Sequence, residues 1–243
     1  MKKLNWIRPL TDVQHYPLIY SAFEATNIKN GEKINLRIED LHEESFNEAL
    51  KLMKNYYFKN NPMLSSKRIE NDEISMNEIF ESWKEILQQK ISIVCYEENS
   101  NEIIGLNFLS VITEEEFDMK PTNGEVYAEV KRVSRFLKDI FFNPFDHYCV
   151  KQILTGVGSY VSDKYNNLEI EAEMLKVRAD IGKMFNIQVT SEIFPTEISQ
   201  NAAILSEFEE NFSIDYNKLP KIVCEGFFPG IKETKLKIMS RKF

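Results

Sequence analysis

Residues 152–194 read QILTGVGSYVSDKYNNLEIEAEMLKVRADIGKMFNIQVTSEIF, and the succession of patterns in this stretch decides the fold. Residues 152–162 are rich in β-branched and aromatic side chains, which predicts a strand. A helix follows, because small and apolar residues recur on one helical face. These are Leu168, Ala172, Leu175, Ala179 and Gly182. Residues 187–194 predict a second strand, which a right-handed crossover should place parallel to the first.

Upstream of this unit, two strands are predicted at residues 91–97 and 103–113. The turn-forming run at 99–101 separates them, so we expect an antiparallel hairpin. A helix over residues 125–139 then connects the hairpin to the strand–helix–strand unit, because its apolar residues recur on one face.

The remaining elements follow the same periodicity arguments. They are a strand at 35–39, helices at 46–60, 75–87 and 198–205, and strands at 212–216 and 234–243. This order predicts a mixed α/β fold (α+β) with a central mixed sheet and helices on both faces. No repeat, low-complexity tract or long linker interrupts residues 1–243, so we expect a single domain in which residues 1–33 form an ordered arm.

Composition excludes several classes of protein. The chain carries a formal net charge of −8, which disfavours a broad nucleic-acid surface and attraction to an anionic membrane. No apolar run approaches the roughly 18–20 residues that span a bilayer. Cys95, Cys149 and Cys224 are odd in number and far apart, which predicts free thiols and no zinc site. We therefore expect a soluble cytoplasmic protein, either a monomer or a weak dimer.

Several local stretches, in their order along the chain, resemble the GNAT superfamily of acyl-CoA N-acyltransferases. They are YYFKNNPM at 56–63, ISIVCYEE at 91–98, EIIGLN at 102–107, VTSEIF at 189–194, Ser199-Gln200 and KIMSRKF at 237–243. Within that superfamily, the sequence is most similar to the insect arylalkylamine N-acetyltransferase-like group, from about residue 6 to residue 243. The resemblance implies a twisted central sheet, acetyl-CoA as cofactor and a small amine as acceptor.

The resemblance also implies which residues would hold acetyl-CoA. A strand N–H near Tyr160 or Val161 would polarise the thioester carbonyl. The family's phosphate-binding loop, roughly Tyr-Arg-Gly-x-Gly-Ile-Gly/Ala, aligns with the start of the following helix. The aligned cofactor-binding positions are Tyr165, Asn166, Asn167, Leu168, Glu169 and Ile170.

This loop departs from the family pattern, because its arginine and glycines are absent and four acids lie in residues 163–173. Like charges about 4 Å apart cost about 4 kcal/mol at an effective dielectric of about 20. A deficit of about 4 kcal/mol corresponds to about a thousandfold weaker binding. Lys164, Lys176 and Arg178 would offset part of this deficit. Alternatively, Asn166 or Asn167 caps a helix that binds no ligand.

Two positions are candidates for catalysis by the same resemblance. Ser199 matches a serine near the thioester, where its hydroxyl would protonate the leaving thiolate or bind the acceptor. It would otherwise cap a helix. Asn61 stands where the family commonly has a glutamate that acts as general base, and an amide cannot accept a proton at neutral pH. Water or another carboxylate, Glu39 or Glu192, would then have to serve as base.

Two further hypotheses concern the cleft. Gly156 and Gly158 either permit a β-bulge that splays the strands or allow close packing. The aromatic run at 56–58 either lines an arylalkyl pocket or belongs to the core. The resemblance thus predicts acetyl transfer from acetyl-CoA to a small arylalkylamine, weakened or lost through the altered loop and Asn61. The alternative is a non-catalytic binding or interaction protein of the same fold.

Overall fold

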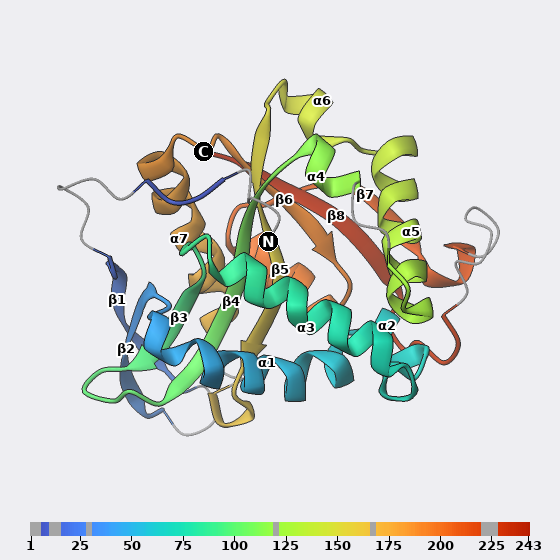
Figure 1. Cartoon of the computed structure of the whole chain (residues 1–243). Coiled ribbons are helices and arrows are strands. Elements are labelled where there is room, and N and C mark those ends of the chain that lie inside the picture. Colours follow the sequence, from blue (N-terminus) through green and yellow to red (C-terminus); the bar gives the residue numbers. More distant parts are fainter. Residues whose placement is uncertain (1–5, 10–15, 28–30, 119–121, 166–168, 220–227) are drawn as a thin grey trace.

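A computed structural model describes residues 6–9, 16–27, 31–118, 122–165, 169–219 and 228–243. Its centre is an eight-stranded sheet in the order β1-β2-β3-β4-β5-β6-β8-β7 (Figure 1). The strands are β1 (Ile19–Thr26), β2 (Lys33–Asp40), β3 (Ile93–Glu97), β4 (Ile103–Thr113), β5 (Gln152–Val161), β6 (Val189–Phe194), β7 (Glu209–Asp215) and β8 (Lys235–Lys242). β5 and β6 pair in parallel, and β3 and β4 form an antiparallel hairpin. Both predictions are therefore confirmed.

Strand β1 corrects the expectation that residues 1–33 form only an arm. It pairs antiparallel with β2, with Phe23 opposite Leu36, and forms one edge of the sheet. Most of its residues are exposed or half-buried, and Ala25 is its one fully buried position. A strand with so little burial has a weak hydrophobic pattern, so the sequence did not distinguish it from an arm.

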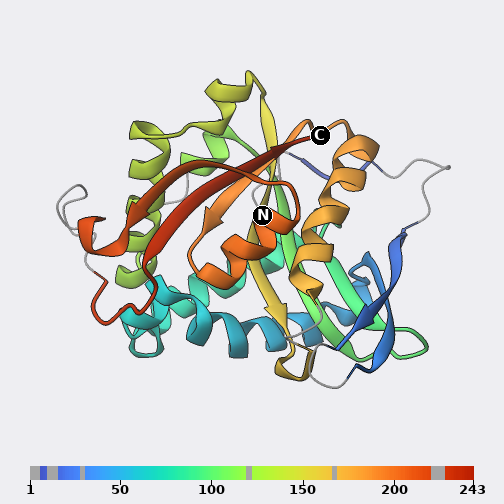
Figure 2. The same ribbon diagram turned by 180° about the vertical axis from the view of Figure 1, so that it is seen from behind.

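Helices cover both faces of the sheet, as predicted. One face carries α1 (Phe46–Asn60), α3 (Glu73–Leu87) and α5 (Glu125–Ile140) (Figure 1). The other carries α7 (Ile170–Phe185) and α8 (Glu197–Leu205) (Figure 2). Three short helices were not predicted, because five residues are too few to show helical periodicity. They are α2 (Pro62–Ser66), α4 (Glu114–Asp118) and α6 (Pro144–Tyr148).

The core consists of apolar layers on the two sides of the sheet. On the α1 and α3 side, Met53 and Trp83 pack with Phe108 of β4. On the α7 side, Ile170 and Met174 pack with the first strands. Among the helices that the structure describes, none is long and apolar enough to cross a membrane.

The sheet opens at the middle of β5. Leu109 of β4 pairs with Gly156, and Phe108 pairs with Gly158, so Val157 is an extra residue in β5. The predicted bulge at these glycines is confirmed. Ladder pairing between the described strands β5 and β6 is recorded at Leu154 and Thr190 alone, before this bulge. The two strands then diverge, as Figure 1 shows.

Candidate functional site

A cavity of about 900 Å³ lies where β5 and β6 diverge. Its wall combines residues from α1, α3, α5, α7, α8 and strands β4 to β6. The aromatic residues that line it are Tyr56, Tyr57, Trp83, Tyr127, Phe142 and Phe194. The carboxylates of Glu171 and Glu192 and the guanidinium of Arg178 are among the charged groups that line the cavity. A concave site with an apolar wall and a few polar groups is the usual form of a small-molecule site.

Trp83 organises the aromatic wall and joins it to the bulge. Its ring stacks on Phe58 at 5.6 Å between centroids and meets Tyr57 edge-on at 5.4 Å. Its indole Nε1 donates a hydrogen bond to the carbonyl of Val157, at 3.3 Å. Tyr56 and Tyr57 line the cavity, whereas Phe58 is buried in the core. The aromatic run is therefore divided between the cavity wall and the core, and the arylalkyl ligand stays a prediction.

Asn61 lies on the cavity wall and begins α2. Its Oδ1 accepts hydrogen bonds from the backbone N–H groups of Met63 (3.1 Å) and Leu64 (3.3 Å). Its Nδ2 donates to the Tyr57 hydroxyl at 3.0 Å, and burial raises the pKa of Tyr57 to about 12. Both ends of the amide are thus engaged by a neutral helix cap and a neutral phenol. The side chain has no group that could take a proton from an amine.

Ser199 also lies on the cavity wall, in the first turn of α8. Its hydroxyl donates to the Thr196 carbonyl at 2.9 Å, and its backbone N–H donates to Thr196 Oγ1 at 3.1 Å. The Thr196 backbone N–H in turn donates to Ser199 Oγ at 3.3 Å. These reciprocal bonds form a capping box. A chemical role for this hydroxyl stays a prediction.

Arg178 and Glu192 form an ion pair at the position where β5 and β6 diverge. Arg178 is fully buried, and its Nη1 and Nη2 bind the two carboxylate oxygens of Glu192 at 2.9 and 3.3 Å. Glu192 also accepts a hydrogen bond from the backbone N–H of Gly156. A Cβ atom at position 156 would overlap the Glu192 carboxylate and lie 2.6 Å from Arg178 Nη2. The pair therefore lies directly against the glycine backbone.

Two further contacts make Arg178 a link across three strands. Nη2 donates to Asn107 Oδ1 of β4 at 2.9 Å, and Nη1 donates to Thr190 Oγ1 of β6 at 3.2 Å. Asn107 Nδ2 donates to the Gly158 carbonyl of β5 at 3.2 Å. The guanidinium of Arg178 binds Glu192, and its charge also lowers the pKa of Glu171, so it offsets part of the effect of one of the loop acids. Lys176 does pair with Glu173, at 2.6 Å.

Glu171 was not predicted as a site residue. It lies in the first turn of α7, is partly buried and lines the cavity. Burial raises its pKa, the charge of Glu192 adds to this effect, and a hydrogen bond from Ser159 Oγ at 3.2 Å opposes it. Glu39, considered as a base, lies outside the residues that line the cavity and binds Arg37 and His42, each at 3.0 Å.

The positions that the resemblance assigns to acetyl-CoA lie elsewhere. Tyr160 and Val161 pair with β4, Tyr165 is buried with its hydroxyl on Glu97, and Ile170 belongs to the core. Residues 166–168 fall outside the described residues. None of the assigned positions that the structure does describe is among the residues lining the cavity. The residue that precedes α7 is Glu169, and the predicted cap by Asn166 or Asn167 falls on positions outside the described residues.

The start of α7 does not fit a pyrophosphate. Glu169 has φ 52°, forms no side-chain cap and is exposed, and Glu171 and Glu173 follow in the first turn. A diphosphate beside three carboxylates would meet like charges, whereas an anion site needs open N–H groups and positive charge. The Gly156 N–H, at the opening of the strands, is already taken by Glu192. These residues provide no complementary site for the phosphates of a coenzyme A derivative.

The sequence matches no protein-family model and no curated protein. Among solved structures, the mosquito protein assigned as arylalkylamine N-acetyltransferase 7, from Aedes aegypti, superposes with a TM-score of 0.90 and 27% identity. That match covers 98% of this chain and 99% of the mosquito chain.

Two more distant structures share the fold. Arylalkylamine N-acetyltransferase 2 of Aedes aegypti gives a TM-score of 0.69 at 13% identity, over 85% of this chain and 98% of that chain. The polyamine N-acetyltransferase of Drosophila melanogaster is described as forming N-acetylagmatine. It gives a TM-score of 0.69 at 9% identity, over 86% of this chain and 100% of the Drosophila chain. The chain is therefore a GNAT-fold protein whose structure resembles those of the insect arylalkylamine N-acetyltransferases.

Proposed function

We propose that this chain is an N-acetyltransferase-like protein that binds a small amine, an arylalkylamine or a polyamine, in its central cavity. We further propose that its transfer of an acetyl group from acetyl-CoA is weak or lost. The observation that carries the proposal is the cavity wall, which combines aromatic rings with the carboxylates of Glu171 and Glu192. Aromatic faces and carboxylates are the groups that recognise an alkylammonium ion.

The activities for which the similar proteins are named support the choice of ligand. Arylalkylamine and polyamine N-acetyltransferases share this fold, and the Aedes aegypti protein matches almost the whole chain. A cavity of about 900 Å³ lies in the range of volumes that take small organic ligands. The ring of an arylalkylamine would lie against Trp83 and Tyr57.

Three features support weak or absent acetyl transfer. Acids occupy the start of α7, Glu192 holds the Gly156 N–H, and Asn61 cannot act as a base. The fold family generally uses acetyl-CoA, but no step through that cofactor follows from these residues. A purely non-catalytic amine-binding protein is the second candidate function. The Glu192–Gly156 contact favours it, because it occupies a backbone N–H at the opening of the strands.

Calorimetric titration tests the two halves of the proposal separately. Acetyl-CoA and, in other runs, tryptamine or spermidine would be titrated into the purified chain. We expect heat of binding from an amine, and acetyl-CoA binding at least a hundredfold weaker. Micromolar binding of acetyl-CoA together with multiple-turnover acetylation of tryptamine would overturn the claim of weak transfer. Absence of binding by every amine tested would overturn the amine site.

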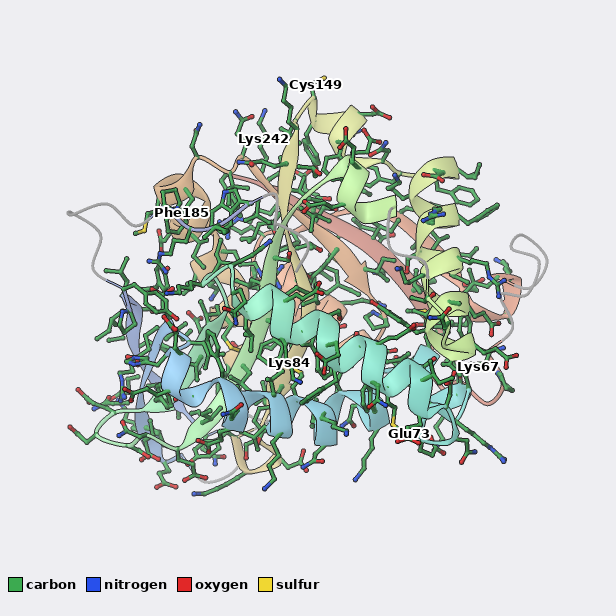
Figure 3. The ribbon with its side chains drawn as sticks, viewed as in Figure 1. Lys67, Glu73, Lys84, Cys149, Phe185 and Lys242 are labelled. Atoms are coloured by element: carbon green, nitrogen blue, oxygen red, sulfur yellow. The ribbon has the colours of Figure 1, made fainter. Side chains whose placement is uncertain are left out.

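The proposal places the protein in the cytoplasm, with a small amine as its partner and no nucleic acid or membrane. The cysteines among the described residues, Cys95 and Cys149, are free, which supports a reducing compartment. Cys95 is buried, and burial raises its pKa to about 12. Cys149 is exposed and lies at the outer edge of the molecule (Figure 3). Both thiols should react with a thiol-specific reagent after denaturation of protein purified without reductant.

A further inference from the structure

Glu171 is a cavity-lining carboxylate that has no salt-bridge partner among the described residues, although the nearby charge of Arg178 acts on it. Glu192 is held by Arg178, and Glu173 is held by Lys176. Glu171 accepts one hydrogen bond, from the neutral Ser159 hydroxyl, and forms no ion pair with any residue that the structure describes. It lines the cavity from the first turn of α7. A partly buried carboxylate in this setting is stabilised by a cation that enters the cavity.

We propose that the Glu171 carboxylate binds the ammonium group of the ligand, with the Tyr56 ring forming one side of the ammonium subsite. This inference rests on the proposed function for the amine class of the ligand, and it adds where the charged end is held. In this proposal the start of α7, where the resemblance places the phosphates of the cofactor, binds a cation instead.

Tyr56 is placed to contribute. It lines the cavity, and its ring meets Tyr160 edge-on at 5.2 Å between centroids. Burial raises the pKa of the Tyr56 phenol, and the negative charge of Glu171 raises it further. The phenol therefore stays protonated, and its ring offers an electron-rich face in the same cavity as the carboxylate. A cation over such a face gains a cation–π interaction.

The setting selects an organic ammonium ion over a metal ion. No group of three or more histidine, cysteine, aspartate or glutamate side chains suited to a metal is found among the described residues. The rest of the wall includes Tyr57, Trp83 and Tyr127, which would cover the carbon skeleton of an amine. A primary ammonium can donate three hydrogen bonds, and Glu171 supplies an oxygen acceptor for it.

The test uses the full chain and its Glu171→Gln variant, with Glu173→Gln as the matched control. Both changes remove one acid from the same helical turn, but Glu173 already pairs with Lys176. Calorimetry with tryptamine should show at least tenfold weaker binding to Glu171→Gln and a change below twofold for Glu173→Gln. N-acetyltryptamine, which lacks the ammonium group, should bind the wild-type chain and Glu171→Gln equally weakly.

The pH dependence of tryptamine binding provides a second readout. Wild-type affinity should fall as pH falls and Glu171 becomes protonated, whereas the affinity of Glu171→Gln should follow pH less steeply. The groups facing Glu171 are Ser159, Arg178, Glu192 and Tyr56, and none of these is changed. Wild-type binding that Glu171→Gln leaves intact would overturn this inference alone. A wild-type chain that binds no amine would overturn the proposed function as well.

Discussion

Arg178 contacts side chains of β4 and β6 and holds Glu192 against β5. Its guanidinium is fully buried, and each of its nitrogens has an acceptor. A buried arginine with bidentate geometry fixes the separation of the strands more narrowly than apolar packing would. The opening between β5 and β6 is thus set by one side chain from α7.

Replacement of Arg178 by methionine should lower the free energy of unfolding by about 3–5 kcal/mol, because Glu192 would be left as an unpaired buried charge. Urea unfolding followed by circular dichroism measures this loss. Lys183→Met, at an exposed position on the same helix, should change stability by less than about 0.5 kcal/mol. Equal effects of the two changes would contradict the role given to Arg178.

Glu171 should lower stability at neutral pH, because burial raises its pKa in the folded state. The folded state then binds this proton more tightly than the unfolded state, so the carboxylate costs stability as pH rises through its raised pKa. Glu171→Gln should therefore raise the urea midpoint at pH 8 and change it much less at pH 4, where most of the carboxylate is protonated in both states. A gain of the same size at both pH values would contradict this explanation.

At the scale of elements, β5 depends on a bulge between two glycines. Gly156 has the Glu192 carboxylate and Arg178 where a Cβ would lie. A Cβ atom at position 158 would lie 3.2 Å from the sulfur of Met53, near the end of a side chain that can move. Position 156 therefore has no space for a Cβ atom, whereas position 158 could accommodate one if the Met53 side chain moved.

Gly156→Ala should cost about 1–3 kcal/mol through overpacking, and Gly158→Ala should cost clearly less. Thermal unfolding of the two variants compares them on the same strand. The double variant Gly156→Ala with Glu192→Ala should recover part of the loss, because the smaller side chain makes room. Equal destabilisation by both single alanines would show that the Glu192 contact does not set the requirement at position 156.

At the scale of the molecule, two tryptophans report on different regions. Trp83 lines the cavity, whereas Trp6 packs edge-on against Phe185 at 5.8 Å. Figure 3 shows Phe185 at one side of the molecule and Lys84, next to Trp83 in sequence, on the helix α3 in front of the sheet. A ligand in the cavity should therefore change the emission of Trp83 alone.

Titration with spermidine, which does not absorb in the tryptophan range, should change the fluorescence of the Trp6→Phe variant as much as that of the wild type. Trp83→Phe should lose the response. Amine at one hundred times its dissociation constant should also stabilise the fold by about 2.7 kcal/mol. A response that persists in Trp83→Phe would place the ligand outside the cavity.

Much of the fold was open to prediction from the sequence, because strand and helix periodicity is local. The β5–α7–β6 unit, the hairpin and the helices α1, α3, α5 and α8 were all predicted. Strand β1 and the three short helices were not, since a half-exposed edge strand and single helical turns leave too weak a pattern. Asn61 and Ser199 were identified by resemblance, and capping was an alternative for Ser199 alone, whereas the partners of both side chains required the tertiary structure.

The sequence by itself determined the order of strands and helices, the glycines of the bulge and the acids at the start of α7. Only the tertiary structure decided which charges meet. Arg178 and Glu192 are separated by 14 residues and a loop, and their distance depends on how α7 packs on β6. The same packing leaves Glu171 without a salt bridge of its own, because the guanidinium of Arg178 is bound to Glu192. Periodicity records which face of an element is buried, and it carries no information on which distant side chain lies opposite.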